Sequence, residues 1–509
     1  MTFATIDIAG YPQLRPFAGA FANLGERRTV GGRRLARAPG PSKLLADIDA
    51  ALDACAVKDG ATLSFHHHLR NGDGVLNAVL AAVAARGLRD IHVAATSIFP
   101  VHAPLVEHIR HGVVTRLSAA FVAGPVGEAV SQGLLPTALV LRTHGGRARA
   151  LEAGELHVDV AFVAAPAADP YGNVTGRVGP GACGTLGYPL CDVEVADRVV
   201  AVTDTLLPYP VPAIDIPQHL VDFVVTVPAI GDARGIVSGI TRPAEDAASL
   251  KLADTAAAVI AASGLLRDGF SFQTGAGGIS LATAALVKRR MLDERIAGSF
   301  AAGGITGFHV DMLEAGLFRA LLDVQCFDLA AVESYRRNPA HQSMSASMYA
   351  NPMNRGPVVN MLDAVILGAT EIDLDFNVNV TTKADGVIMG GSGGHADTAA
   401  GAKLAIITSR LTAAGFPKVV ERVGTLTTPG ETVDVLVTEA GIAVNPGQAE
   451  LALRLRAAGL PLRSIEELHA LAARDATGRP PARADGPVVA VSEYRDGTVT
   501  DLVRRAAVD

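Results

Sequence analysis

An internal repeat constrains this chain more than any other feature of its sequence. The segments DVAFVAAPAADPYGNV (159–174) and DAVILGATEIDLDFNV (363–378) lie 204 residues apart. Their shared residues are Asp159 and Asp363, Asp169 and Asp373, Asn173 and Asn377, and Val174 and Val378. The same spacing relates VEHIRHGVV to VDMLEAGLF, and a slip of one residue relates DRVVAVT, ending at Thr203, to AKLAIIT, ending at Thr408. Three matches in one order indicate two homologous halves.

Each half also contains short, continuous apolar runs between alanine- and leucine-rich stretches. Such runs are DIHVAAT (90–96), DVAFVAA (159–165), DAVILGA (363–369) and KLAIITS (403–409). They are typical of parallel strands covered on both faces by helices. The sequence therefore predicts the α/β class, with two homologous α/β domains of mainly parallel sheets flanked by helices. We expect a helix to begin at Ser42, and helices to end at Gly112 and Gly316, since glycine adopts the left-handed conformation that closes a helix.

The repeat predicts an N-terminal arm (1–41), a first domain (42–254) and a second domain (255–509) that a C-terminal extension completes. The extension contains a strand, VDVLVTEAGIAVN, and a turn signal, Asp496-Gly497, between VVAVSEY and TVTDLV. Two similar domains that face each other form a cleft, where a pocket is expected.

Composition narrows the possible partners. The net charge of −7 and the absence of tryptophan give no broad basic surface and few stacking rings, so we expect no nucleic acid. The basic stretch around Arg27, Arg28, Arg33 and Arg34 is interpreted as a solvated or partner-wrapping arm.

The same composition addresses membranes and redox chemistry. The apolar run at 78–85 is too short to span a membrane, and MTFATIDIAGYPQLRPF lacks a secretory pattern, so a cytoplasmic location is expected. Without CxxC spacing, four cysteines fit reduced thiols better than bridges or a zinc site: Cys55, Cys183, Cys191 and Cys326.

Two glycine-rich loops in the second half are the strongest candidates for chemistry. FQTGAGGISLATAAL places Gly275, Gly277 and Gly278 between a short strand and a helix, where backbone N–H groups can stabilise negative charge. The loop GGSGGHAD (390–397) precedes a second helix, and without a ligand it would be a tight connection. Neither loop matches GxGxxG or the P-loop, which argues against a nucleotide.

Histidines raise the question of a metal. His66, His67 and His68 are consecutive, and on a strand the middle one points away from the other two, so the three do not readily form one coordination sphere. His395 and Asp397 lack further ligands nearby. We therefore expect no metal. In LRTHGGRAR (141–149), His144, Gly145, Gly146 and Arg147 either bind an anion or form a turn.

The motifs resemble a known family. DGATLSFHHHLRNGDGVLN, THGGRARALEAGELHVDVAF, CGTLGYPLCD, GFSFQTGAGGISLA, AAGGIT, EIDLDFNVNV, GGSGGHADTAAGAKLAI and VDVLVTEAGIAVNP occur in the order seen in citrate lyase alpha subunits, from about residue 45 to the C-terminus. More distantly, both halves resemble family I CoA-transferases.

The resemblance implies a citrate CoA-transferase, one component of an ATP-independent citrate lyase. Such a subunit exchanges acetyl for citrate on the thioester of a gamma acyl carrier subunit, releasing acetate, and a beta subunit then cleaves the citryl group. It implies that the chain binds no cofactor of its own and acts on CoA or the CoA-like prosthetic group of the carrier. The alternatives are a citramalate lyase alpha subunit, an acyl-CoA hydrolase and a non-catalytic scaffold.

The resemblance also assigns the site. It places the glycine loops around the reacting carbonyl, with the backbone N–H groups of Gly277, Gly278, Gly393 and Gly394 as oxyanion donors. Gly275, Gly391 and His395 border the same pocket. Because the three carboxylates of citrate need cationic partners, we also nominate His66, Arg70, Arg147 and His395 as substrate-binding residues.

One departure from the wider family bears on the mechanism. Family I enzymes use a glutamate nucleophile just before the segment equivalent to VDMLEAG, whereas FAAGGITGFHV (300–310) contains no carboxylate. We therefore expect citrate's own carboxylate to attack the acetyl thioester in a ternary complex, forming a mixed anhydride that the thiolate then attacks.

Overall fold

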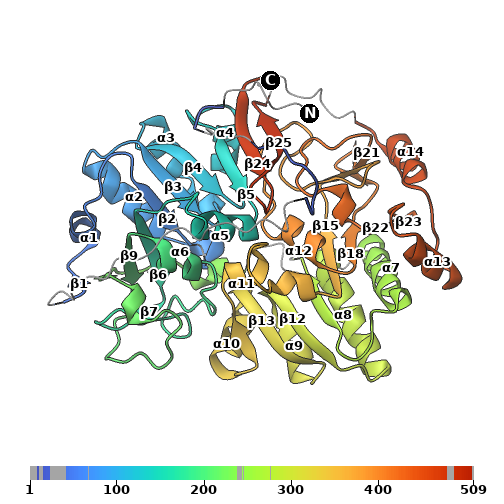
Figure 1. Ribbon diagram of the computed structural model, residues 1–509, viewed down its shortest axis with the longest axis horizontal. Helices are drawn as coiled ribbons and strands as arrows, with labels where there is room; N and C mark the ends of the chain where they lie inside the picture. The colour runs from blue at the N-terminus through green and yellow to red at the C-terminus, as the bar shows by residue number, and fades with distance from the viewer. Residues whose placement is uncertain are drawn as a thin grey trace.

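Two mainly parallel sheets form the frame of the molecule. The computed structural model describes residues 8–10, 15–22, 42–66, 68–237, 244, 246–275, 277–478 and 486–506. Figure 1 shows the sheets side by side, the first mainly in blue and green with red C-terminal strands at its edge, and the second mainly in yellow and orange. The predicted α/β class is confirmed.

The first sheet has ten strands, of which only the last pair is antiparallel. In sheet order they are β1 (Leu44–Leu45), β10 (Phe223–Thr226), β9 (Arg198–Thr203), β6 (Val160–Ala165), β2 (Thr62–Phe65), β3 (Ile91–Ala95), β4 (Val114–Ala119), β5 (Leu139–Arg142), β24 (Val488–Glu493) and β25 (Val499–Arg504). The helices of this half are α1 (Ile48–Ala54), α2 (Val75–Ala85), α3 (Leu105–Arg110), α4 (Pro125–Ser131), α5 (His144–Glu152) and α6 (Pro189–Val195).

The second sheet has eight strands, again with one antiparallel pair at an edge. They are β14 (His341–Ser343), β13 (Phe318–Cys326), β12 (Gly298–Ile305), β11 (Ser271–Thr274), β15 (Ala364–Gly368), β18 (Ala405–Thr408), β22 (Val435–Thr438) and β23 (Gly441–Val444). Its helices are α7 (Ala247–Ser263), α8 (Gly278–Asp293), α9 (Gly307–Glu314), α10 (Leu329–Arg337), α11 (Ala346–Ala350), α12 (His395–Gly401), α13 (Ala449–Ala457) and α14 (Ile465–Asp475).

Short strands and 3₁₀ turns complete the connections. The strands are β7 (Ala167–Ala168), β8 (Val174–Thr175), β16 (Glu371–Asp373), β17 (Val378–Asn379), β19 (Thr412–Ala413), β20 (Phe416–Pro417) and β21 (Val419–Val420). The turns are at Arg70–Gly72, Pro100–His102, Gln218–Leu220, Ala233–Ile236, Val358–Met361 and Gly430–Thr432.

The internal repeat is visible in the hydrogen bonds. Asp159 accepts the N–H of Thr62 at the start of β2 (2.7 Å), and Asp363 accepts the N–H of Ser271 at the start of β11 (2.9 Å). Strand order makes β2, β3, β6 and β9 equivalent to β11, β12, β15 and β18. The two halves therefore share one frame, as the repeat predicted.

Helix ends follow the sequence in two places and depart from it in one. Gly112 follows α3 at φ 69° and Gly316 follows α9 at φ 70°, the left-handed conformation expected of them. The expectation for Ser42 was wrong, because its hydroxyl accepts the N–H of Leu44 beside β1 and the helix begins later, capped by Asp47.

The C-terminal part of the chain is divided between the two sheets. VDVLVTEAGIAVN forms two antiparallel strands, β22 and β23, of the second sheet. The predicted turn at Asp496 and Gly497 joins β24 to β25, but β24 pairs in parallel with β5 and so extends the first sheet (Figure 1). The expected placement of the whole extension in the second domain was wrong, because the free edge of β5 captures the hairpin. The expected boundary at 254 also falls within α7.

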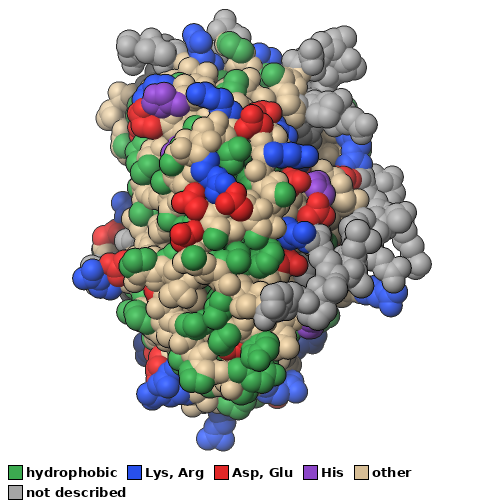
Figure 2. Space-filling model, turned by 90° about the vertical axis from the view of Figure 1, so that its left-hand side faces the viewer, with side chains coloured by type: hydrophobic (Ala, Val, Ile, Leu, Met, Phe, Trp, Pro, Cys, Tyr) green, Lys and Arg blue, Asp and Glu red, His purple; other side chains and the backbone are tan. Residues whose placement is uncertain are grey.

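The described N-terminal residues pack on this hairpin. Phe17 donates its N–H to the Val499 carbonyl (3.0 Å), and its ring lies 5.2 Å from that of Tyr494. Arg27, Arg28, Arg33 and Arg34 lie outside the described residues. Among the described residues no helix is long and apolar enough to cross a membrane. Basic and acidic side chains are mixed on the face shown in Figure 2.

Candidate active site

The second glycine loop is fastened to the first half of the molecule. Gly393 donates its N–H to the Ala120 carbonyl (3.0 Å) and accepts the N–H of His144 (2.8 Å). A Cβ on Gly391 would lie 2.4 Å from the Ala120 carbonyl oxygen, so only glycine allows this approach. Because the Gly393 N–H is already used, Gly394 is the better candidate for an oxyanion donor in this loop.

The first glycine loop leaves its backbone open. Gly275 donates its N–H to the Ile366 carbonyl (2.8 Å), which fixes the loop to β15. Gly277 caps α8 without a side-chain hydrogen bond, and Gly278 is the first helical residue. A Cβ on Gly277 would meet nothing within 4 Å. The N–H groups at the start of α8 are therefore available to an anion.

The two glycine loops are linked through shared neighbours. Gln273, at the end of β11, donates from Nε2 to the Tyr349 hydroxyl (2.8 Å), and a Cβ on Gly394 would lie 2.5 Å from that hydroxyl. His395 contacts the carbonyl of Gly368 (2.9 Å), which lines one cavity with Gly277 and Gly278. The loops predicted to surround the acyl group thus border the same region.

His395 holds this region together. Its Nε2 faces the Gly368 carbonyl and so donates, and its Nδ1 lies 2.8 Å from the Thr428 hydroxyl, which donates to it. Burial lowers the pKa of His395 to about 4, so the ring is neutral at pH 7. This geometry suits a positioning residue and gives citrate no cation.

Arg147, also predicted to bind substrate, forms its hydrogen bonds within the protein interior. Its guanidinium forms two 2.7 Å bonds to Asp192 and a third to the Ala94 carbonyl. Both side chains are buried. Burial alone would raise the pKa of Asp192, but the charge of Arg147 holds that pKa below its usual value. His66 lies 3.6 Å from the same carboxylate. The Arg147–Asp192 pair therefore lies against the loop after β2, through His66.

Arg70 differs from Arg147 because its charge is not neutralised. Its side chain is 6% exposed, and within the described part of the chain its Nη1 has no hydrogen-bond partner. The guanidinium lies 4.4 Å from the ring centroid of Phe327. Burial lowers the pKa of Arg70 to about 10, which leaves it charged at neutral pH. Its φ of 53° is a strained conformation typical of functional positions.

Three other polar side chains in the described part of the chain have buried atoms without partners. His144 Nδ1, Thr185 Oγ1 and Gln273 Oε1 are buried without hydrogen-bond partners among the described residues. The Tyr188 ring lies 4.6 Å from that of His144 and 5.6 Å from that of His68. Sequence reasoning did not single out Thr185, Tyr188, Gln273 or Tyr349. CGTLGYPLCD, the counterpart of GGSGGHAD in the first half, was the available signal for the first two.

The end of β12 belongs to the stretch 300–310, which contains no carboxylate nucleophile, and it has little room for a side chain. A Cβ on Gly303 would lie 2.6 Å from the Gln273 side-chain amide, and one on Gly304 would lie 2.3 Å from the Phe327 ring. Any side chain at these positions therefore collides with a neighbour. The Arg70 guanidinium lies over the same Phe327 ring, so a cation borders the stretch in which the resemblance to family I CoA-transferases implied a glutamate.

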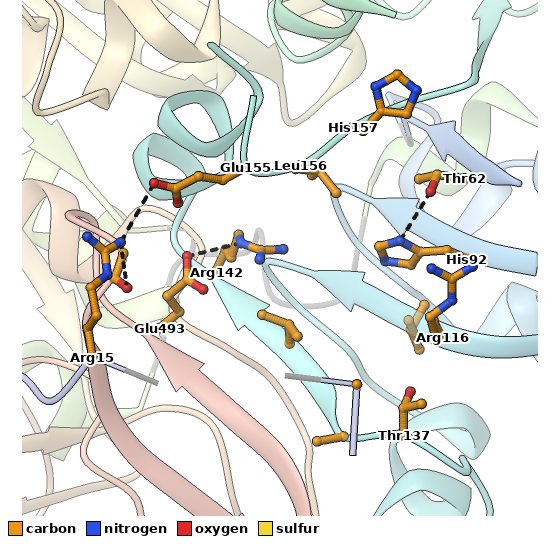
Figure 3. A pocket seen from close by; sticks show the side chains of 15 residues that line it. Arg15, Thr62, His92, Arg116, Thr137, Arg142, Glu155, Leu156, His157 and Glu493 are labelled. Carbon is orange, nitrogen blue, oxygen red and sulfur yellow. Dashed lines mark hydrogen bonds and ion pairs between the residues drawn. The ribbon is translucent and has the colours of Figure 1, made fainter. Parts of the chain in front are cut away.

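Two cavities lie outside this polar interior. One of about 420 Å³ opens between the start of α8 and the ends of β15 and β18. The other, of about 540 Å³, lies over the first sheet and includes the starts of β2 and β3 (Figure 3). In the larger cavity Arg142 pairs with Glu493 (3.0 Å) and Arg15 with Glu155 (3.7 Å), so these charges are already balanced.

Two clusters within the described residues have the composition of a metal site. Asp323, Cys326 and His341 are buried, and Asp323 already accepts hydrogen bonds from the other two at 3.0 Å. His157, Asp159 and Asp197 form the other near the surface. Neither includes a predicted site residue. His67 lies outside the described residues.

Comparison with known proteins decides the family. The family model for the citrate lyase alpha subunit (CitF) matches residues 41–506. The chain belongs to the citrate lyase alpha subunit family. It is 46% identical to the citrate lyase alpha chain of Escherichia coli K12, over 91% of both chains, and 44% identical to that of Klebsiella pneumoniae, again over 91% of both.

Solved structures agree with this assignment. A citrate lyase alpha subunit from Streptococcus mutans, determined in complex with citrate, superposes with a TM-score of 0.92 at 44% identity and 95% coverage of both chains. A malonate decarboxylase hetero-tetramer from Pseudomonas shares the fold alone, with a TM-score of 0.63 at 18% identity over 87% of this chain and 95% of that one.

Membership of the citrate lyase alpha family makes the chain the citrate CoA-transferase component of a multi-subunit enzyme. These relatives favour citrate lyase over a citramalate lyase subunit, a hydrolase or a scaffold. The predicted activity and family are thus confirmed.

Proposed function

We propose that this alpha subunit moves the thioester from acetyl to citrate by direct attack of a citrate carboxylate, with both substrates bound at once. The observation that carries the proposal is Arg70, a buried guanidinium without a carboxylate partner among the described residues. It lies over the Phe327 ring, and that same ring leaves no room for a side-chain nucleophile at Gly304. A bound carboxylate neutralises Arg70 and supplies the oxygen that attacks.

The first step forms an anhydride. A citrate carboxylate oxygen attacks the acetyl carbonyl carbon, and the carbonyl electrons move to its oxygen. The backbone N–H groups of Gly277, Gly278 and Gly394 are the candidate donors to that oxyanion, each contributing about 3 kcal/mol when preorganised. Collapse breaks the carbon–sulfur bond and releases the thiolate, leaving a mixed citryl-acetyl anhydride.

The second step completes the exchange. The thiolate attacks the citryl carbonyl of the anhydride, and acetate leaves with one oxygen that came from citrate. Neither step requires a side-chain base, since carboxylate and thiolate are both anionic. Alignment of two bound reactants contributes about 7 to 11 kcal/mol relative to free encounter.

The remaining substrate and partner assignments follow from the same proposal. The thioester is carried by CoA or by the CoA-like prosthetic group of the gamma acyl carrier subunit, and the beta subunit cleaves the citryl product. His144, Thr185 and Gln273 have buried polar atoms without partners among the described residues, and we assign these atoms to the other oxygens of citrate. Gly275 and His395 hold the loops in place by hydrogen bonds, and Gly391 does so by its close approach to Ala120.

A single-turnover experiment with labelled citrate tests the direct attack. Excess enzyme is mixed with acetyl-CoA and citrate labelled with ¹⁸O in its carboxylates, and the acetate is analysed by mass spectrometry. Direct attack predicts one ¹⁸O atom per acetate in the first turnover. An enzyme glutamate would supply that oxygen itself, so unlabelled acetate in the first turnover contradicts the proposal.

Borohydride provides an independent control. It reduces a glutamyl thioester and inactivates an enzyme that forms one, so activity here is expected to survive treatment in the presence of acetyl-CoA. A second control omits citrate. Release of acetate at an equal rate without citrate would instead indicate hydrolysis.

A further inference from the structure

All the charged side chains that line the 420 Å³ cavity beside the first glycine loop are cations. It lies where β15 and β18 end and α8 begins, and its described lining includes Arg410 and Lys418 but no carboxylate. Its volume is within the range of ligand pockets. Gly277 and Gly278, which border the reacting centre, form part of its wall. The lining of this cavity therefore favours an anionic ligand that extends to the acyl site.

Lys418 and Arg410 differ in how they are held. Arg410 is fixed by Asp246 and by a 2.8 Å bond to the Ser249 hydroxyl, both at the start of α7. The ammonium of Lys418 is partly buried, and within the described residues it receives attraction from Glu371 and Glu439 without a hydrogen bond. Burial lowers its pKa. A desolvated cation without a direct partner favours an anion beside it.

The backbone offers a second set of donors to the same cavity. The 16-residue helix α8 begins at Gly278, and its first N–H groups have no side-chain cap. A Cβ on Gly277 or Gly368 would meet nothing within 4 Å, so both face open space. These N–H groups face the thioester end of an acyl carrier arm, whereas the phosphate at the other end of such an arm is recognised by an ammonium such as that of Lys418.

We propose that this cavity binds the phosphate of the pantetheine arm that carries the acyl thioester, with Lys418 as its main side-chain contact. The proposal rests on the proposed transfer function. Ile279, Ala369 and Ala413 supply apolar wall for the body of the arm. The arm then runs past Gly277 and Gly278 and delivers its sulfur end to the citrate site. CoA and the carrier prosthetic group share this phosphate.

The test pairs variants with thioesters that differ in phosphate. Transfer to citrate is measured with acetyl-CoA, acetyl-4′-phosphopantetheine and acetyl-pantetheine, using wild type and Lys418→Gln. We expect Lys418→Gln to raise KM about tenfold for the two phosphate-bearing donors and to leave acetyl-pantetheine unchanged, as fits a lost charge-assisted contact. Lys418→Arg, which keeps the charge, should retain most of the preference for phosphate.

The controls separate this proposal from others. Lys58→Gln changes an exposed lysine in the first half and should alter no donor. An equal loss with all three donors, or a loss with acetyl-CoA alone, would overturn the phosphate assignment. If wild type transfers nothing to citrate from any donor, the transfer function itself fails. Thermal unfolding of each variant shows whether Lys418→Gln remains folded.

Discussion

The loops that follow β2 and β11 occupy equivalent places in the two halves, yet their chemistry is opposite. After β2 the chain presents side-chain cations and imidazoles, including His66, His68 and Arg70. After β11 it presents Gly275, Gly277 and an uncapped helix start. The first loop suits carboxylates, and the second suits an oxyanion held by backbone N–H groups. The two halves thus share one frame, and under the proposed function their loops divide acceptor recognition from donor recognition.

A second pair of positions makes the same point about electrostatics. Asp192 in α6 and Asp397 in α12 precede the equivalent strands β9 and β18. Arg147 holds the pKa of Asp192 low against the effect of burial, whereas burial raises the pKa of Asp397 to about 6 despite Arg495 at 3.6 Å. One carboxylate is firmly ionised, and the other is close to taking up a proton.

The largest effect is expected from breaking the Asp192 pair. Asp192→Asn leaves Arg147 as a buried, uncompensated charge, which should lower the free energy of unfolding by about 3 to 5 kcal/mol. Chemical denaturation measures the change. Asp49→Asn, which removes one exposed partner of Arg86, is the control and should change stability little, because solvent screens this pair. Equal losses would mean that the interior pair has no special role.

The next effect tests the acceptor loop through catalysis. Arg70→Gln removes the cation proposed to bind citrate, and kcat/KM for citrate should fall on the order of 100-fold while the KM for acetyl-CoA changes little. Steady-state kinetics, with citrate and acetyl-CoA varied in turn, measures the effect on each substrate separately. Arg86→Gln, on the surface, is the matched control and should leave both unchanged. A loss confined to acetyl-CoA would assign Arg70 to the donor side.

These outcomes bear on what the sequence could predict. The frame was predictable because Asp159 and Asp363 mark equivalent strands within each repeat. The partners of Arg147 and Gly393 were not, because Asp192 is 45 residues away and Ala120 belongs to the other half. The placement of the β24–β25 hairpin in the first sheet was not predictable either, because β24 pairs with β5, a strand distant in sequence. Local pattern identifies loops and their residue types, and contacts distant in sequence decide which groups remain free.

A moderate effect is expected where the glycine loop meets Tyr349. In Gly394→Ala the new Cβ would lie 2.5 Å from the Tyr349 hydroxyl, so the loop or the ring must shift, and kcat should fall about tenfold through misalignment. Gly356→Ala is the control, since its Cβ meets only the end of Met361 at 3.8 Å. Adding Tyr349→Phe should recover part of the activity. Full activity in Gly394→Ala would show that this turn does not border the reaction.

The smallest effect concerns pH and the two aspartates. Because the pKa of Asp397 is raised to about 6 in the folded state, that state binds its proton more tightly than the unfolded chain, and lowering the pH through 6 stabilises the protein. The stability difference between wild type and Asp397→Asn should shift in favour of wild type by roughly 1 kcal/mol from pH 7.5 to 5.5. The lowered pKa of Asp192 predicts no such shift for Asp192→Asn, since its contribution is lost only at lower pH. Denaturation of the three proteins at both pH values measures the difference, and parallel behaviour of the two variants would remove the electrostatic contrast between the halves.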